Sequence, residues 1–284
     1  QAHFYLETQT ALALLRSGGA LEVFSSTQHP SECQLKIAEL LHKGAKDIVV
    51  TCPRMGGGFG GKESQATHFA MLAALGAHAT GQPVRVRLNR DTDMQQTGKR
   101  HPWFSRYDVS FDSEGLLSGL KVSTYSNGGW SLDLSKPVMQ RCLFHLDNAY
   151  FVPHLDFSGQ VVKTHTLSNT AFRGFGGPQG MLVVDSVLNA VAEHLHLDPA
   201  LVRARNLYGE AERNVTPYFQ EIQDNRLGRI TTELMQSSDY FARRAAIEKL
   251  NQGSRFLKRG IGFQPIKFGI SFTNSMLNQA GALV

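Results

Sequence analysis

Two glycine-rich runs, each with an aromatic residue inside it, are the most distinctive chemical feature of this chain. The first reads MGGGFGGKE over residues 55–63, and the second reads AFRGFGGPQ over residues 171–179. Glycine permits left-handed backbone conformations and lets the main chain come close to a ligand. A helix-like stretch follows each run, and the free N–H groups at a helix start suit an anion. The pair therefore predicts a large anionic cofactor held from two sides.

The first run also matches two nucleotide-binding patterns. The spacing G-x-G-x-x-G over residues 56–61 follows an apolar strand-like run at 47–52, as in a dinucleotide fingerprint, and Asp91 is a candidate for the ribose-binding acid. That pattern leaves the second run unexplained. A P-loop needs Ser or Thr after its Gly-Lys pair, whereas Glu63 stands there and would repel phosphates. Tight turns without a ligand are a further interpretation that stays open.

Length and composition are those of an ordinary globular protein. The 284 residues suffice for two domains, and 42% of them are hydrophobic and 19% charged. No apolar run reaches the roughly 18 residues that span a membrane. The three cysteines are isolated, which argues against a disulfide framework, an iron–sulfur cluster or a zinc site and favours a cytoplasmic location. The net charge of +5 is scattered without interleaved aromatic residues, so nucleic acid is not an expected partner.

The ends of the chain suggest an internal piece of a longer protein. The first residue is Gln1, no signal-peptide pattern follows it, and the last residues, 277–284, lie inside an apolar run. We therefore expect other domains or subunits to complete the molecule, and an apolar end of this kind favours oligomers.

The distribution of strand and helix patterns favours an α+β fold with mixed sheets and flanking helices over a doubly wound sheet, because strands and helices do not alternate regularly. A polar stretch at 210–225 suggests a boundary, with a first domain over 1–212 and the start of a second over 228–284. Strands are predicted at 2–14, 21–27, 47–52, 84–88, 107–111, 117–125, 160–166 and 260–272, and helices at 30–43, 64–80, 178–196, 199–208 and 231–251.

Six runs spread over the whole chain resemble one known family. They are HFYLET at 3–8, STQ at 26–28, RMGGGFGGKE at 54–63, TGKRHP at 97–102, NTAFRGFGGPQ at 169–179 and KFGISFT at 267–273. In this order they resemble the molybdenum hydroxylases, and among them the molybdopterin-binding large subunit of xanthine dehydrogenases. The resemblance implies a molybdenum–molybdopterin cofactor, with iron–sulfur clusters and FAD on other domains or subunits. It also implies hydroxylation of hypoxanthine and xanthine, in purine metabolism, with oxygen derived from water.

The resemblance assigns cofactor contacts to residues that do not ligate the metal directly. It implies that the Gln28 side chain contacts the apical oxo group of molybdenum. It implies that the backbones of Phe59 and Gly60 lie beside the metal and the pterin dithiolene, and that the backbone of Arg173 lies on the other side.

The resemblance also assigns substrate contacts, to five residues in all. Glu63 would hydrogen-bond the purine, and Arg141 would face the charge that develops on the far purine oxygen, so both are candidate catalytic residues. Phe175 and Phe272 would enclose the flat substrate, and Thr273 would add a polar contact.

Related aldehyde oxidases usually carry uncharged residues at the positions of Glu63 and Arg141, so retaining both favours a purine substrate. Hydroxylation of an aldehyde or another N-heterocycle, or a non-catalytic role as an assembly module, remain the alternatives. The general base of the family is expected beyond Val284, so we expect the isolated chain to be inactive.

Overall fold

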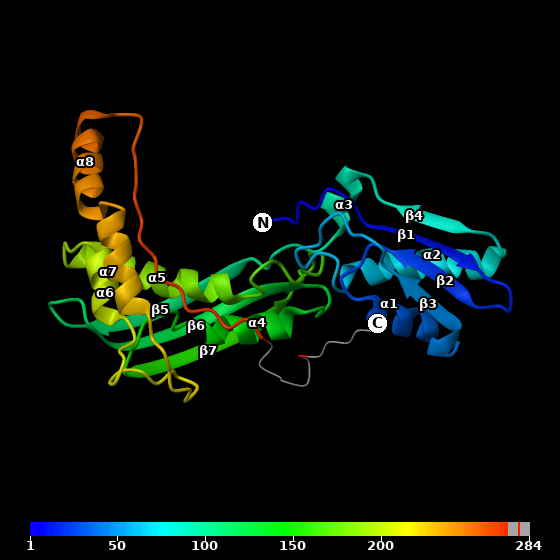
Figure 1. The fold of residues 1–284 in the computed structure, drawn as a ribbon, viewed down its shortest axis with the longest axis horizontal. Coiled ribbons are helices and arrows are strands. Elements are labelled where there is room, and N and C mark those ends of the chain that lie inside the picture. Colours follow the sequence, from blue (N-terminus) through cyan, green and yellow to red (C-terminus); the bar gives the residue numbers. More distant parts are fainter. Residues whose placement is uncertain (272–277, 279–284) are drawn as a thin grey trace. The chain divides into compact units, whose positions relative to one another are not determined.

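The computed structural model describes residues 1–271 and residue 278. The chain divides into two compact units, each assembled from separated segments (Figure 1). The first unit contains residues 1–104, 124–141 and 159–176, and the second contains 105–123, 142–158 and the chain from 177 onward. The expected domain boundary between residues 212 and 228 stays a prediction.

The first unit is built on a four-stranded sheet with two helices packed against it. The strand order is β3 (Ile48–Thr51), β2 (Leu21–Ser25), β1 (Thr10–Leu15) and β4 (Val84–Arg87), and the helices are α1 (Pro30–Leu40) and α2 (Gln65–Thr80). Four buried alanines, at positions 70, 73, 74 and 77, form one face of α2 at helical spacing. Their small side chains let α2 lie close to the sheet, against Ala13 and Val23. Helix α2 ends at Gly81, which is left-handed with a φ of 68°.

The topology of this sheet does not form a dinucleotide-binding unit. Strand β3 precedes the first glycine loop and α2 follows it, but the next strand, β4, pairs with β1 at the opposite edge of the sheet. A dinucleotide site needs those two strands next to each other in one β-α-β unit, whereas β2 and β1 separate them here. Asp91 lies exposed on the short helix α3 (Arg90–Gln96), which the sequence had not indicated.

A second sheet has the strand order β5-β6-β7. Its strands are β5 (Trp103–Phe111), β6 (Leu117–Gly129) and β7 (His154–Lys163), and the predicted β5–β6 hairpin is confirmed. Asp112 shapes its turn, because its Oδ1 accepts hydrogen bonds from the amides of Glu114 and Leu116 at 2.9 Å each. The helices α4 (Ser135–Phe144), α5 (Gly177–His194) and α6 (Pro199–Asn206) also lie in this half of the sequence. The first unit additionally contains the short 3₁₀ helix η1 (Ala45–Asp47).

The core of the second unit lies between its part of this sheet and α5. Leu117, Leu120 and Val122 of β6 are buried together with one face of α5, at positions 184, 187, 188 and 191. The mixed strands and flanking helices confirm the α+β expectation. None of the described helices combines the length and the apolar character that crossing a membrane requires.

The predicted helix over 231–251 is in fact two helices. They are α7 (Leu227–Ser237) and α8 (Tyr240–Gly253), and Asp239 between them is left-handed with a φ of 49°. An amide in that conformation cannot continue an α-helix, so the chain turns there. Both halves carry a helical pattern, and the sequence contains no glycine or proline at the break.

The strand predicted at 2–14 begins too early, and the strand predicted at 260–272 is wrong over its described residues. Residues 1–9 form no strand, and β1 begins only at Thr10. Residues 260–270 form no strand either. Their backbone is hydrogen-bonded by side chains and not by a neighbouring strand. Asn148 bonds both the Pro265 carbonyl at 3.1 Å and the Lys267 amide at 3.2 Å, and His145 Nε2 accepts from the Gly269 amide at 3.1 Å.

Candidate functional site

The first glycine loop, residues 55–63, uses its glycines for conformations that other residues avoid. Gly57 and Gly60 have φ angles of 97° and 93°, and Phe59 between them is left-handed at 56°. A Cβ atom on Gly58 would lie only 2.5 Å from the side-chain oxygen of Gln28. A bulky residue at positive φ is strained and persists where its surroundings impose it, which is common at functional sites.

The second glycine loop repeats this arrangement. Gly174 and Gly176 have φ angles of 98° and 100°, and Phe175 between them is left-handed at 53°. Each loop therefore places one phenylalanine in a strained conformation between two left-handed glycines. The two phenylalanines are the aromatic residues that made both runs distinctive in the sequence.

The two loops contact each other directly through their backbones. The Arg173 amide donates a 2.9 Å hydrogen bond to the Phe59 carbonyl. A Cβ atom on Gly60 would lie 2.6 Å from the Ala171 carbonyl oxygen, so only glycine permits this approach. The structure thus brings together the two loops that the sequence suggested would share one ligand.

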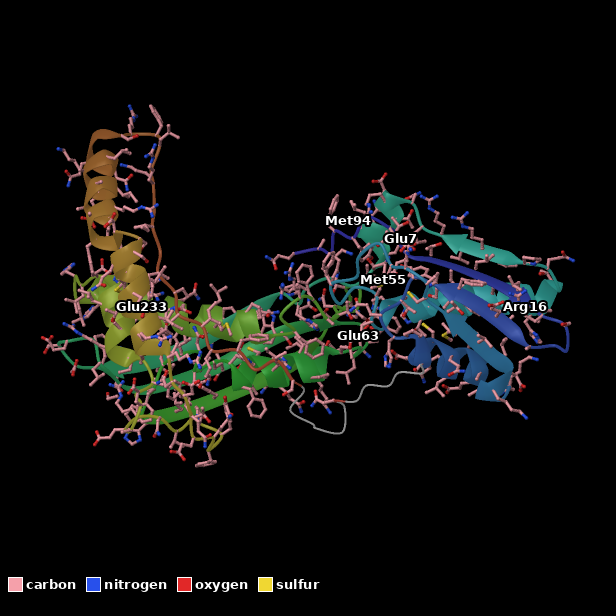
Figure 2. All side chains as sticks on the ribbon, viewed as in Figure 1. Glu7, Arg16, Met55, Glu63, Met94 and Glu233 are labelled. Atoms are coloured by element: carbon pink, nitrogen blue, oxygen red, sulfur yellow. The ribbon has the colours of Figure 1, made fainter. Side chains whose placement is uncertain are left out.

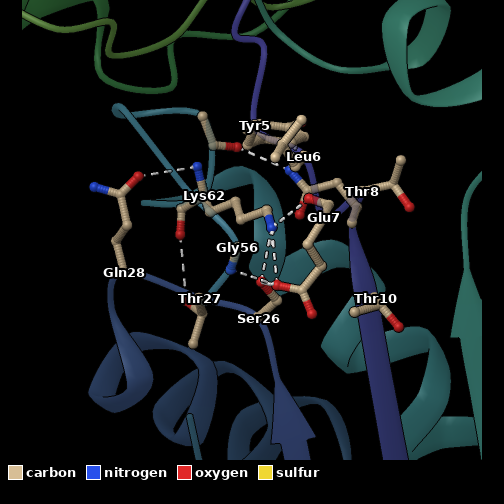
Figure 3. A network of polar contacts seen from close by, with 12 residues as sticks. Tyr5, Leu6, Glu7, Thr8, Thr10, Ser26, Thr27, Gln28, Gly56 and Lys62 are labelled. Atoms are coloured by element: carbon tan, nitrogen blue, oxygen red, sulfur yellow. Dashed lines mark hydrogen bonds and ion pairs between the residues drawn. The ribbon is translucent and has the colours of Figure 1, made fainter. Parts of the chain in front are cut away.

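Gln28, just beyond β2, has its side-chain amide held in one orientation. The oxygen accepts a hydrogen bond from the backbone N–H group of Gly60 at 2.9 Å. It accepts a second one from the backbone N–H group of Lys62 at 3.3 Å (Figure 3). Because these donors require an oxygen partner, the amide is assigned with its NH₂ group directed away from the loop. Gln28 is exposed, so the group that it offers to a ligand is a hydrogen-bond donor.

The N-terminal segment, residues 3–7, alternates between buried and exposed side chains although it is not a strand. His3 and Tyr5 are 4% and 1% exposed, whereas Phe4 and Leu6 are 68% and 82% exposed. This alternation explains why the sequence resembles a strand here. The backbone bonds differ from a ladder, since the amides of both Leu6 and Glu7 donate to the Gly56 carbonyl.

The buried side chains of this segment support both glycine loops. His3 Nε2 donates a 2.7 Å hydrogen bond to the Ala171 carbonyl of the second loop. On the first loop, a Cβ atom on Gly61 would lie 2.7 Å from the His3 ring, and one on Gly57 would lie 3.1 Å from Tyr5. The segment therefore fixes the two loops with respect to each other.

Glu7 continues this support at the start of the first loop. Its carboxylate oxygen Oε2 accepts from the Gly56 amide at 2.9 Å and from the Ser26 hydroxyl at 2.6 Å. Partial burial opposes ionisation of Glu7, but the hydrogen bonds from Gly56 and Ser26 and the charge of Lys62 outweigh it and lower the pKa of the carboxyl.

Lys62 is fully buried and its ammonium group points into the protein. Nζ donates 2.7 Å hydrogen bonds to the Glu7 carbonyl and to the Ser26 hydroxyl (Figure 3). A P-loop lysine must instead reach a bound phosphate. This geometry excludes the P-loop interpretation and gives Lys62, Glu7 and Ser26 a supporting role that the sequence analysis missed.

Glu63, labelled in Figure 2, lies just before α2 and forms no hydrogen bond with any described residue. Burial raises the pKa of its carboxyl, and the nearby Asp133 carboxylate adds to this effect against the opposing charge of His29. A half-buried carboxyl that has no hydrogen-bond partner within the described part of the chain is suited to bind a polar ligand atom. The role of Glu63 in binding a substrate stays a prediction.

Arg141 lies in the last turn of α4 and belongs to the first unit, as Glu63 does. Burial lowers the pKa of its guanidinium, which nevertheless stays charged at neutral pH. Phe272 and Thr273 lie outside the described residues. Of the predicted substrate contacts, the structure therefore places Glu63, Arg141 and Phe175, all in the first unit.

Asp133 is a further polar centre that sequence reasoning missed. It is left-handed with a φ of 41°, and its carboxylate accepts from Ser64 Oγ at 2.9 Å, Gln65 Nε2 at 2.6 Å and Thr170 Oγ1 at 2.9 Å. These bonds tie the start of α2 to the residue before the second glycine loop. Asp133, Ser64 and Gln65 also line a cavity of about 500 Å³.

Arg100 holds the second loop from outside. Its guanidinium lies 4.0 Å from the centre of the Phe172 ring and donates a 2.9 Å hydrogen bond to the Arg173 carbonyl. Arg100 of the TGKRHP run, residues 97–102, therefore has a structural role. It fixes the backbone of Arg173, whose amide is hydrogen-bonded to the first loop.

Comparison with known families decides what these loops are. A family model described as the molybdopterin cofactor-binding domain matches residues 1–207. The chain belongs to this family. Among curated proteins, a xanthine dehydrogenase of Calliphora vicina is 44% identical and a xanthine dehydrogenase/oxidase of Gallus gallus is 47% identical. Both alignments cover 100% of this chain and 21% of the relative, so the chain spans about a fifth of their length.

Solved structures show the same molybdopterin-binding fold. The aldehyde oxidoreductase from Desulfovibrio gigas has a TM-score of 0.78 at 27% identity, covering 90% of this chain and 27% of that one. Quinoline 2-oxidoreductase from Pseudomonas putida 86 has a TM-score of 0.76 at 22% identity, covering 87% of this chain and 32% of that one. The latter similarity concerns the fold alone.

The residues at the two loops fit the molybdopterin cofactor. The amides of Gly58 and Phe59 donate no hydrogen bond to any described residue, and the Gln28 NH₂ group is also exposed. Such donors suit the anionic and hydrogen-bond-accepting parts of a cofactor. Within the described residues, no group of three or more His, Cys, Asp or Glu side chains is placed to hold a metal ion directly. A cofactor that carries its own metal needs donors of this kind rather than protein ligands.

Two buried histidines of the first unit make its stability depend on pH. Burial lowers the pKa of both His3 and His101 from 6.5 to about 4, so folding favours their neutral forms. The stabilisation is complete above pH 6.5 and is lost as the pH falls towards 4. We expect each histidine to reduce the unfolding free energy by roughly 2 kcal/mol between pH 7 and pH 5. Urea unfolding at both pH values tests this, and a His3→Gln variant that keeps the full pH dependence would contradict the assignment for His3.

Proposed function

We propose that this chain is the molybdopterin-binding part of an enzyme that oxidises hypoxanthine and xanthine. The identity of 44–47% to xanthine dehydrogenases over the whole chain supports this proposal. The observation that carries it is Glu63, a half-buried carboxyl with a raised pKa that no described residue bonds. Together with Arg141 it offers a flat, polar heterocycle a hydrogen-bonding group and a positive charge.

On the cofactor side, the chain would contribute orientation and hydrogen bonds. The bound molybdenum cofactor would supply two-electron oxidation and the transfer of an oxygen atom that originates from water. Gln28 would donate a hydrogen bond from its NH₂ group to an oxo atom of the cofactor, because its own oxygen is held by Gly60 and Lys62. The backbones of Phe59, Gly60 and Arg173 would fix the cofactor between the two loops.

On the substrate side, charge and shape would select a purine. Glu63 would hydrogen-bond the purine ring, and burial, which raises the pKa of its carboxyl, favours the protonated form that can donate. Arg141 would stabilise negative charge that develops on the purine oxygen. Phe175 and Phe272 would enclose the ring, and Thr273 would add a polar contact. The general base would come from the remainder of the protein.

The proposal includes partners and a location. Iron–sulfur clusters and FAD on other domains or subunits would take the electrons from the molybdenum site. The complete enzyme would be an oligomer of the cytoplasm, and the boundary between its two molybdopterin-binding domains would fall between residues 212 and 228.

The full-length protein that contains this chain provides the test. We expect it to contain about one molybdenum atom per polypeptide and to convert xanthine to urate with ¹⁸O taken from labelled water. Glu63→Gln should raise KM for xanthine while the molybdenum content stays unchanged. Efficient oxidation of aldehydes with no turnover of xanthine would replace the purine proposal. Bound molybdenum without turnover of either substrate would indicate a non-catalytic module.

A further inference from the structure

Lys62 occupies an unusual position for a charged residue in a glycine loop. It is 0% exposed, and its ammonium contacts two other segments of the chain. Nζ donates to the Glu7 carbonyl and the Ser26 hydroxyl, lies 3.5 Å from the Glu7 carboxylate and lies 4.6 Å from the centre of the Tyr5 ring. A buried charge is costly unless it is paired and hydrogen-bonded, and this one is satisfied on all sides.

The backbone of the same residue holds Gln28 from both ends. The backbone N–H group of Gln28 donates to the Lys62 carbonyl at 2.8 Å. In the other direction, the backbone N–H group of Lys62 donates to the side-chain oxygen of Gln28, Oε1, at 3.3 Å. Thr27 Oγ1 also donates to the Lys62 carbonyl, at 3.3 Å. Ser26, which accepts a bond from the ammonium, stands only two residues before Gln28 (Figure 3). Side chain and backbone of Lys62 therefore anchor the same short segment, residues 26–28.

The alternative orientation of Gln28 shows why this anchor matters. If the Lys62 backbone moved, Gln28 Oε1 would lose one of its two amide donors, and the amide could turn its oxygen outward. An outward oxygen would face the electron-rich atoms of the cofactor and repel them. The direction of the NH₂ group thus depends on a lysine whose charged end points away from the cofactor loops.

We propose that Lys62 is a positioning residue that fixes the Gln28 side chain and the first glycine loop for cofactor binding. The inference rests on the proposed function, since it assumes that Gln28 contacts the cofactor. Lys62 would act only through Gln28 and the loop, and would touch neither the substrate nor the metal.

A double-mutant cycle in the full-length enzyme tests this coupling. The variants are Gln28→Ala, Lys62→Met and the combination, and the measurements are molybdenum per polypeptide and the g-values of the Mo(V) electron paramagnetic resonance signal. We expect Lys62→Met to lower molybdenum affinity about 10- to 100-fold, as loss of an outer-shell partner typically does, and to shift the g-values. In the Gln28→Ala background, Lys62→Met should add little.

Ser26→Ala is the milder second variant, because it removes one acceptor of the ammonium with little change in volume. If Lys62→Met does not fold, the double-mutant cycle of Ser26→Ala with Gln28→Ala tests the coupling instead. We expect Ser26→Ala to change the molybdenum content and the g-values in the same direction, by a smaller amount. Arg203→Met in the second unit is the matched control, since Arg203 is also a buried cation, paired with Asp185 at 3.0 Å. It should lower thermal stability and leave the resonance signal unchanged.

The outcomes separate the two proposals. Unchanged molybdenum content and g-values in Gln28→Ala would remove the proposed cofactor role of Gln28. If Gln28→Ala has an effect and the effect of Lys62→Met simply adds to it in the double variant, the positioning role of Lys62 is overturned. The proposed cofactor role of Gln28 would then still stand. An Arg203→Met variant that shifts the g-values as Lys62→Met does would show that general destabilisation explains the signal, and would equally overturn it.

Discussion

Replacing Arg141 with methionine in the full-length enzyme is expected to lower kcat/KM for xanthine by about 10²–10³-fold and to leave aldehyde oxidation within a few-fold of its original rate. Methionine keeps much of the length and apolar surface of the arginine stem but removes the charge. Xanthine develops negative charge on an oxygen far from the reacting carbon, whereas a simple aldehyde has no group there. Steady-state rates with both substrates measure the difference.

Arg229→Met on α7 serves as the control for loss of an arginine, because Arg229 is exposed and its ion pair with Glu233 is 3.5 Å long. This variant should oxidise both substrates at the original rate. An equal loss on xanthine and aldehyde in Arg141→Met would show that Arg141 supports the fold or the cofactor rather than substrate choice.

Replacing Asp185 with alanine is expected to destabilise the second unit by about 3–5 kcal/mol. One carboxylate oxygen of Asp185 accepts from Tyr150 at 2.8 Å and from Arg203 at 3.0 Å. The other accepts from Asn148 at 3.1 Å and from Gln264 at 2.6 Å. Alanine would leave all four donors, including a buried guanidinium, without their acceptor.

Denaturant unfolding of the variant measures this loss. Lys121→Ala in the same unit is the control, because its ion pair with Asp156 is exposed and should contribute less than about 1 kcal/mol. A loss below about 1 kcal/mol in Asp185→Ala would mean that water replaces the carboxylate, and that the four-donor cluster adds little to stability.

Much of this architecture could be predicted from local patterns. The alanine-rich stretch at 64–80 predicted α2 and its end at Gly81, and the alternation at 117–125 predicted β6. The two glycine runs predicted left-handed backbone, and the positive φ angles at Gly57, Gly60, Gly174 and Gly176 agree. Such features depend on residues close together in the chain, so the sequence displays them.

Features that depend on distant partners could not be predicted in this way. Residues 3–7 alternate as a strand does, yet their partners are loops at positions 56 and 171 rather than a neighbouring strand. The inward direction of the Lys62 side chain depends on Glu7 and Ser26, and no spacing rule connects these three residues. The role of Asp133 could not be predicted either, because its hydrogen-bond partners lie 37 to 69 positions away in the sequence.

The hydrogen bond between His3 and Ala171 joins residues 168 positions apart, which has a consequence for biosynthesis. The first glycine loop leaves the ribosome well before the second. Arg173 follows Phe59 by 114 positions, which take about 6 to 23 s at 5–20 residues per second. During that interval, Phe59 lacks the partner that holds its strained backbone. The contact between the two glycine loops therefore forms only late in the synthesis of this chain.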